Sequence, residues 1–144
     1  MFQHGDTARQ IAAIGVYSLL PSKVRYVGEL VAVLPPDPLA SFLADGGYLP
    51  RGVPMLKHVL ALPGQTVCRV GLSIFVDAIA VGDAHERDSR GRPLPVWQGC
   101  RVVADDELFL MNWQSTDSLD GRYFGPISSS AVLARAQPVW IRKE

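Results

Sequence analysis

The sequence has 144 residues, of which 48% are hydrophobic and 19% charged, and its formal net charge at pH 7 is zero. This composition fits one globular domain with a hydrophobic core, and a balanced charge without a basic block argues against a nucleic-acid partner or an anionic membrane surface. The apolar run IAAIGVYSLL at 11–20 is shorter than the roughly 18 residues that a spanning helix needs, so we expect a soluble chain.

Short segments separated by Gly and Pro predict mostly strands. Residues 25–34 predict a strand, with Gly28 as a bulge or a close backbone approach. A short helix is expected next, with Asp37 as its N-cap, Pro38 at the first helical position and Gly46 as its stop. Further strands are predicted at 53–62, 66–70, 73–77, 78–83, 99–105, 107–113 and 132–142.

Two long polar segments interrupt these strands. Residues 84–95 predict an exposed loop. Residues 114–130 mix aromatic residues with carboxylates and an arginine, which is not the composition of a disordered segment. We expect Arg122 to pair with Asp120 or Asp117 and so to hold an Ω-type loop. The whole pattern predicts one all-β, β-rich domain of coiled sheets with short helices in loops.

Cys68 and Cys100 are the only cysteines, and they lack the spacing and the histidine partners of a zinc site. They can be buried small hydrophobic residues, or they can form one disulfide. A disulfide would imply an oxidising compartment and would stabilise the fold by roughly 3–4 kcal/mol. The three histidines show no metal spacing, and we expect neither a metal nor another cofactor.

A lysine interrupts the strand-like run MLKHVLAL. Alternation places Lys57 on the face of Val59 and Ala61, which reads as a core-facing side. Such a lysine can extend its amine from a sheet edge into water. Alternatively, enclosure lowers its pKa until a neutral amine can take a proton from a hydroxyl, as in a Ser/Lys dyad.

Three blocks occur in an order and spacing similar to those of the signal peptidase I family: VGELVAV, LKHVLALPGQTV and MNWQSTDSLDGRYFGP. The block SLDGRYFGP most resembles the TraF-type conjugative-transfer branch. The resemblance implies a β-rich, barrel-like catalytic core at 14–144, after a divergent or truncated segment at 1–13. It also implies that Lys57 is the general base, that Ser118 orients it, and that Asp120 and Arg122 support the site.

The family's nucleophilic serine has no counterpart in this sequence. The match of the segment IGVY puts the serine position at Ile11 and an expected proline at Ala13, and neither Thr7 nor Ser18 is in register. The membrane anchor that family members carry upstream is also not seen. A truncated or replaced N-terminus explains both features, and so does a pseudo-enzyme that has lost its nucleophile.

Three functions remain open. The first is a serine endopeptidase that cleaves exported or pilin-like precursors of a conjugation apparatus at the periplasmic face of the inner membrane, with little activity as written. The second is a peptidase-derived module that binds an extended precursor or partner segment by β-augmentation. The third is a cytosolic self-cleaving repressor-type domain, against which a disulfide would argue.

Overall fold

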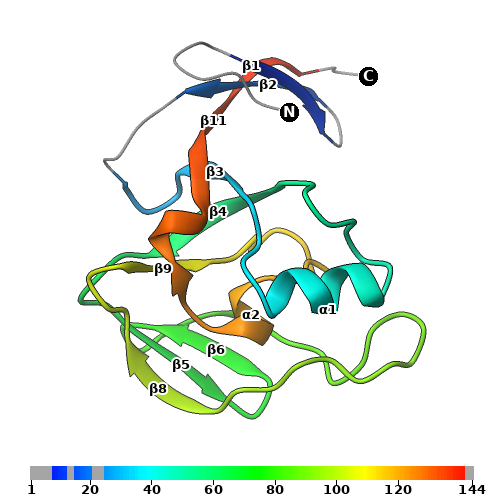
Figure 1. The fold of residues 1–144 in the computed structure, drawn as a ribbon. Coiled ribbons are helices and arrows are strands. Elements are labelled where there is room, and N and C mark those ends of the chain that lie inside the picture. Colours follow the sequence, from blue (N-terminus) through cyan, green and yellow to red (C-terminus); the bar gives the residue numbers. More distant parts are fainter. Residues whose placement is uncertain (1–7, 13–14, 21–24, 142–144) are drawn as a thin grey trace. The chain divides into compact units, whose positions relative to one another are not determined.

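A computed structural model describes residues 8–12, 15–20 and 25–141 (Figure 1). Strands dominate it, with two short α-helices and one 3₁₀ turn at Ser129–Ala131 among the described residues, so the predicted all-β class is confirmed. The chain divides into two compact units. The first comprises Met1–Arg25, Glu29–Leu56 and Ala131–Glu144, and the second comprises Tyr26–Gly28 and Lys57–Ser130.

The first unit contains an antiparallel sheet in the order β1-β2-β11-β3. These strands span Ala8–Ala12, Gly15–Leu20, Val132–Ile141 and Leu30–Val33, respectively. Pro138 cannot donate a backbone hydrogen bond, and the register of β11 against β2 shifts directly after it. On β3 the side chains of Val31, Ala32 and Val33 are fully buried and supply much of this unit's core.

A buried carboxylate precedes β3. Glu29 is fully buried, and its Oε2 accepts hydrogen bonds from Arg25 at 2.6 Å and from Arg135 on β11 at 2.9 Å. Because a buried charge is costly unless it is paired, the two guanidinium groups are what allow Glu29 to remain at this position.

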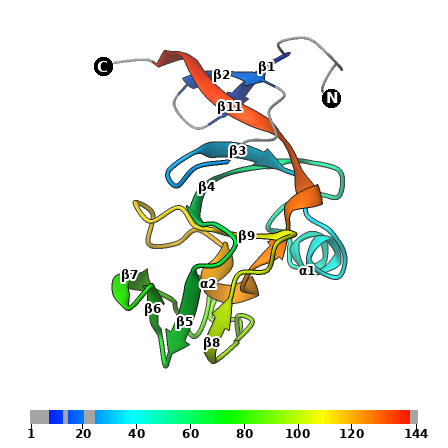
Figure 2. The same cartoon turned by 90° about the vertical axis from the view of Figure 1, so that its left-hand side faces the viewer.

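The second unit contains two sheets. One has the order β4-β9-β10, with β4 spanning Met55–Ala61, of which Lys57 and the residues after it belong to this unit, β9 Glu107–Leu110 and β10 Ile127–Ser128. The other has the order β7-β6-β5-β8, shown side by side in Figure 2, at Ile79–Asp83, Ser73–Val76, Thr66–Val70 and Gly99–Val102. Their apolar faces form one core of Ala61, Val67, Ile74, Val76, Val103, Phe109 and Met111. This core carries the segments that hold the site.

Several element boundaries differ from the predictions. The strand predicted at 25–34 is only Leu30–Val33, because residues before it form a turn in which Gly28 has a φ of +94°. Helix α1 spans Leu39–Asp45 and its N-cap is Pro38, one residue later than predicted, while Gly46 ends it as predicted. Asp37 nevertheless caps this turn, since its Oδ1 accepts the Ser41 backbone N–H at 3.2 Å.

The other differences lie at strand ends and loops. Strands β8 and β9 are three residues shorter than the predicted segments 99–105 and 107–113, since they end at Val102 and Leu110. The segment 114–130, predicted as a loop, contains helix α2 at Gly121–Phe124 and the short strand β10. Strands β1 and β2 were not predicted. Within the described residues no helix is long and apolar enough to cross a membrane.

Candidate active site

The alternation of β4 directs Lys57 into the interior of the second unit. Lys57, Val59 and Ala61 are buried, whereas His58 and Leu60 between them are partly exposed. The predicted face of Lys57 is therefore observed. Only 8% of the Lys57 surface is exposed, so its amine does not extend freely into water.

The Lys57 amine meets a hydroxyl. Lys57 Nζ donates a hydrogen bond to Ser118 Oγ at 2.7 Å, from a residue 61 positions away in the chain. Burial lowers the pKa of Lys57 below its ordinary value of 10.5, and the positive charge of Arg122 adds to this effect, while the Asp120 carboxylate opposes it. Because desolvation is the largest of these influences, the pKa shift is toward the neutral amine, the form that accepts a proton.

Asp120 and Arg122 form a buried ion pair beside Ser118. Arg122 Nε and Nη2 donate to the two Asp120 oxygens, each at 2.9 Å, and both residues are 2% exposed. Arg122 Nη2 also donates to the backbone oxygen of Ser115 at 2.8 Å, and Asp120 Oδ1 accepts the Arg122 backbone N–H at the start of α2. Of the two predicted pairs, the structure contains Asp120–Arg122, and the Asp117 side chain is 90% exposed.

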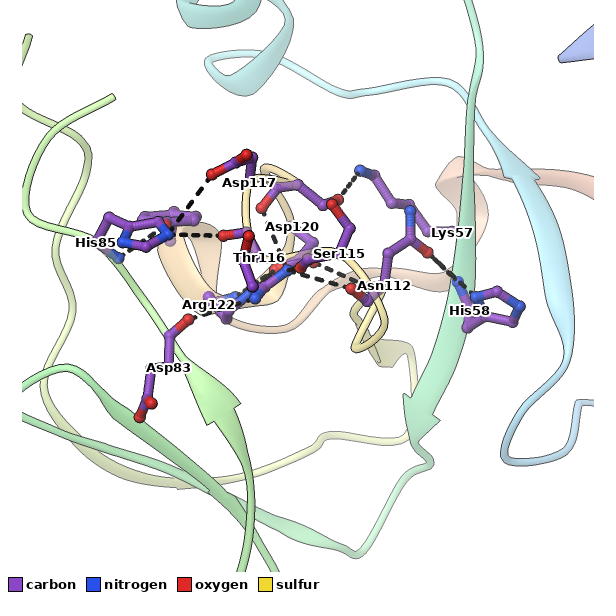
Figure 3. Close-up of polar contacts among 12 residues, drawn as sticks. Lys57, His58, Asp83, His85, Asn112, Ser115, Thr116, Asp117, Asp120 and Arg122 are labelled. Carbon is purple, nitrogen blue, oxygen red and sulfur yellow. Dashed lines mark hydrogen bonds and ion pairs between the residues drawn. The ribbon is translucent and has the colours of Figure 1, made fainter. Parts of the chain in front are cut away.

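Figure 3 shows Ser115, Asp120 and Arg122 of this region, with Lys57 on the neighbouring strand. The loop that follows β9 is also tied to the segment after β7, because His85 Nε2 lies 2.7 Å from the Thr116 carbonyl oxygen. The backbone N–H of His85 donates to Tyr123 Oη at 2.8 Å. Polar contacts on both sides therefore fix the loop that carries Ser118.

Sequence reasoning missed two residues that support α2. Arg69 is 1% exposed, and its Nη1 donates to the Arg122 carbonyl oxygen at 2.8 Å. Trp97 Nε1 donates to the Gly121 carbonyl oxygen at 3.0 Å. Strand alternation could have identified Arg69. It lies two residues after Val67 and therefore on the same, buried face of β5, just as Lys57 shares the buried face of β4 with Val59. Trp97 carried none beyond its size.

The position of the expected nucleophile lies on β1, where Ile11 pairs with Val16 of β2. Ala13, the position of the expected proline, and the predicted domain boundary at 13/14 lie outside the described residues. Cys68 and Cys100, adjacent across β5 and β8, form a disulfide. The structure therefore selects the bonded alternative for these cysteines.

Among the described residues, no group of three or more His, Cys, Asp or Glu side chains is placed to hold a metal ion. The described site brings together an amine, a hydroxyl and an ion pair. Such a set moves protons: a neutral amine can accept one from a hydroxyl, and a buried ion pair can hold the groups in place.

Known proteins resemble this chain over most of its length. The family described as signal peptidase, peptidase S26, matches residues 11–141. A probable conjugal transfer protein TraF of Sinorhizobium fredii is 38% identical, over 78% of this chain and 63% of that protein. A conjugal transfer protein TraF of Agrobacterium fabrum is 37% identical, over 78% and 68%. The chain therefore spans about two thirds of the length of these relatives. A solved signal peptidase I of Enterococcus faecalis aligns with a TM-score of 0.46 and 15% identity, over 78% of this chain and 97% of that one.

Proposed function

Because the chain belongs to the signal peptidase S26 family, we propose that it is a serine-endopeptidase domain of the Ser/Lys type in which Lys57 is the general base. The observation that supports this most is the buried contact between the Lys57 amine and the Ser118 hydroxyl at 2.7 Å. A lysine that only extended its amine from a sheet edge into water would not be 8% exposed.

In this mechanism the neutral Lys57 amine takes the proton of a serine hydroxyl while that oxygen attacks the carbonyl carbon of the scissile peptide bond. The ammonium then gives this proton to the leaving amine as the carbon–nitrogen bond breaks. An acyl-enzyme ester remains. A water molecule then attacks its carbonyl carbon while the same amine takes the water proton, and the serine oxygen leaves and takes that proton back from the ammonium. Each step needs Lys57 to exchange protons near neutral pH, which its lowered pKa favours.

Ser118 holds the amine of Lys57 in position, and Asp120 and Arg122 hold the segment that carries Ser118. The rigid ion pair, with both partners 2% exposed, suits this supporting role.

The chain as written is expected to have little peptidase activity, since isoleucine occupies the position of the nucleophile. Removing one member of a catalytic unit abolishes most of its covalent route. The same observation favours a second candidate function, a peptidase-derived module that binds an extended segment without cleaving it. In either case the partner is an exported or pilin-like precursor used in conjugation. The conjugal transfer names of the relatives support this assignment, and the disulfide supports a periplasmic location.

The experiment is cleavage of a fluorogenic peptide with small residues before its scissile bond. It compares the chain as written, Ile11→Ser and the matched control Ile11→Ala, each with and without Lys57→Met. We expect turnover only in Ile11→Ser with Lys57 present, at least about 100-fold above the other chains.

Other results are equally informative. If the unmodified chain cleaves the peptide and Lys57→Met abolishes this turnover, the predicted lack of activity is wrong. Ser118→Ala would then test whether the Ser118 hydroxyl, which contacts the Lys57 amine, is the nucleophile. Turnover that persists in every Lys57→Met chain contradicts the proposed base. If no chain cleaves but the peptide binds in calorimetry, the binding module is the better assignment.

A further inference from the structure

The β4–β9 ladder ends beside Lys57. Near this end a backbone bond joins these segments, from Met111 N–H to the His58 carbonyl oxygen at 2.9 Å, and β9 itself ends at Leu110. The next group along β4 is the His58 N–H, which belongs to the peptide between Lys57 and His58. A side chain meets it, because Asn112 Oδ1 accepts this N–H at 3.1 Å.

We propose that Asn112 is a positioning residue for Lys57: its side-chain oxygen, in place of a backbone carbonyl of β9, accepts the His58 N–H, and the residue joins the Lys57–His58 peptide to the Asp120–Arg122 pair. This inference rests on the proposed role of Lys57 as the base. Figure 3 shows the Asn112 amide reaching β4 at His58.

The backbone of Asn112 supplies the other half of the connection. Its N–H donates to Asp120 Oδ2 at 2.9 Å, and its carbonyl oxygen accepts from Arg122 Nη2 at 3.3 Å. One residue therefore contacts the peptide that carries Lys57 and both members of the ion pair that supports Ser118. A displacement at Asn112 changes both sides of the 2.7 Å contact between Lys57 and Ser118.

The same oxygen fixes the tautomer of His58. A backbone N–H can only donate, so the Asn112 atom that faces it is the oxygen, which also lies 3.2 Å from His58 Nδ1. This imidazole nitrogen must carry a hydrogen to bond that oxygen. The ring of Trp113 packs against the imidazole with 4.6 Å between ring centroids. Neutral His58 is thus held as the Nδ1–H tautomer, a directly measurable signature of the contact.

Positioning matters here because a lysine side chain has four rotatable bonds and no rigidity of its own. With the peptide fixed, the amine stays on Ser118 and away from water, under the opposing electrostatic influences of Asp120, which raises its pKa, and Arg122, which lowers it. Without the amide, the peptide gains freedom, water reaches the amine, and the pKa of Lys57 moves back toward its ordinary value.

The test uses nuclear magnetic resonance on the full chain as written, so it needs no activity. Titration of the Lys57 side-chain signals gives its pKa, exchange of the His58 amide reports its hydrogen bond, and the imidazole nitrogen shifts report the tautomer. Asn112→Ala removes the acceptor and Asn112→Asp keeps one. Gln114→Ala is the matched control, since it removes an exposed side-chain amide from the same loop.

In Asn112→Ala we expect the His58 amide to exchange about tenfold faster or more and the pKa of Lys57 to rise. Asn112→Asp should retain the amide protection, and Gln114→Ala should change neither quantity. Unchanged exchange and pKa in Asn112→Ala would overturn the inference, as would equal changes in Gln114→Ala. An Nε2–H tautomer in the unmodified chain overturns it whether or not the variants fold. A Lys57 that titrates at its ordinary pKa in the unmodified chain contradicts the proposed base instead, so the two failures are distinguishable.

Discussion

Lys57 Nζ and Ser118 Oγ lie 2.7 Å apart, although 61 positions separate the two residues. Two local features produce this contact. The alternation of β4 turns Lys57 inward, and the Asp120–Arg122 pair folds the loop that brings Ser118 to it. The contact keeps an ionisable amine out of water. The pKa of Lys57 therefore depends on the fold and also determines whether Lys57 can act as the proposed base.

The lowered pKa makes the stability of the chain depend on pH in a defined direction. Between the folded pKa of Lys57 and 10.5, the unfolded chain binds this proton and the folded chain does not. The free energy of unfolding, relative to a Lys57→Met variant, therefore rises with pH by about 1.4 kcal/mol per pH unit in this window. The destabilisation caused by burying the charged Lys57 amine is complete below the pKa of the folded chain and disappears above 10.5.

We thus expect Lys57→Met to be more stable than the unmodified chain at neutral pH and the difference to shrink as the pH rises. Urea unfolding at a series of pH values measures it. Leu60→Met, on the same strand, is the control, and its difference should not vary with pH. A difference for Lys57→Met that is equally flat would show that the pKa of Lys57 is not lowered.

The Asp120–Arg122 pair predicts a large loss of stability from a small change. Asp120→Ala leaves the Arg122 guanidinium, 2% exposed, without its carboxylate, and removing one partner of a buried pair costs about 3–5 kcal/mol. Asp117→Ala is the matched control, because Asp117 is 90% exposed and its loss should change the free energy of unfolding by about 0.5 kcal/mol or less. Urea unfolding of both variants tests this. Similar losses in the two would mean that the pair does not hold the loop.

The sequence predicts the direction of Lys57 well because strand alternation has a fixed period, and burial follows from it. It predicts less well where strands end. The residues before β3 form a turn around Gly28, and β9 stops at Leu110, so a side chain rather than the backbone completes the ladder at His58. The role of Asn112 depends on that end and could not be predicted from spacing.

Other parts of the site could not be predicted for different reasons. The assignment of Ser118 came from family resemblance, since spacing alone does not bring residues 57 and 118 together. Arg69 shows the same alternation as Lys57 but was missed, because a lone arginine in a short strand more often lies at an edge. The hairpin of β1 and β2 was missed because the sequence between these strands, around Ala13, lacks Asn-Gly or Asp-Gly turn pairs.

The disulfide predicts a measurable dependence on redox conditions. Cys68 and Cys100 are adjacent partners in the β5–β8 register and enclose a separation of 32 residues. Replacing both with Ser should lower the free energy of unfolding by roughly 3–4 kcal/mol in the chain-entropy description. Reductant should destabilise the unmodified chain and make it heavier by the mass of two hydrogen atoms. The double variant is the control, and a response of that variant to reductant, or none of the unmodified chain, would contradict the bond.

Gly121 predicts a steric limit at the start of α2. A Cβ at this residue would lie 2.6 Å from Phe109 Cε1 and 2.7 Å from the Leu110 carbonyl oxygen. The carbonyl belongs to β9 and cannot move without disturbing the strand, so Gly121→Ala should cost about 1–3 kcal/mol. At Gly82 the added Cβ would meet only the terminal methyl of Met111, a flexible group, so Gly82→Ala is the matched control with a smaller cost. Thermal or urea unfolding compares them. If Gly121→Ala is the milder change, α2 is not packed as closely against β9 as these distances require, and the support of Ser118 from that side is weaker than described.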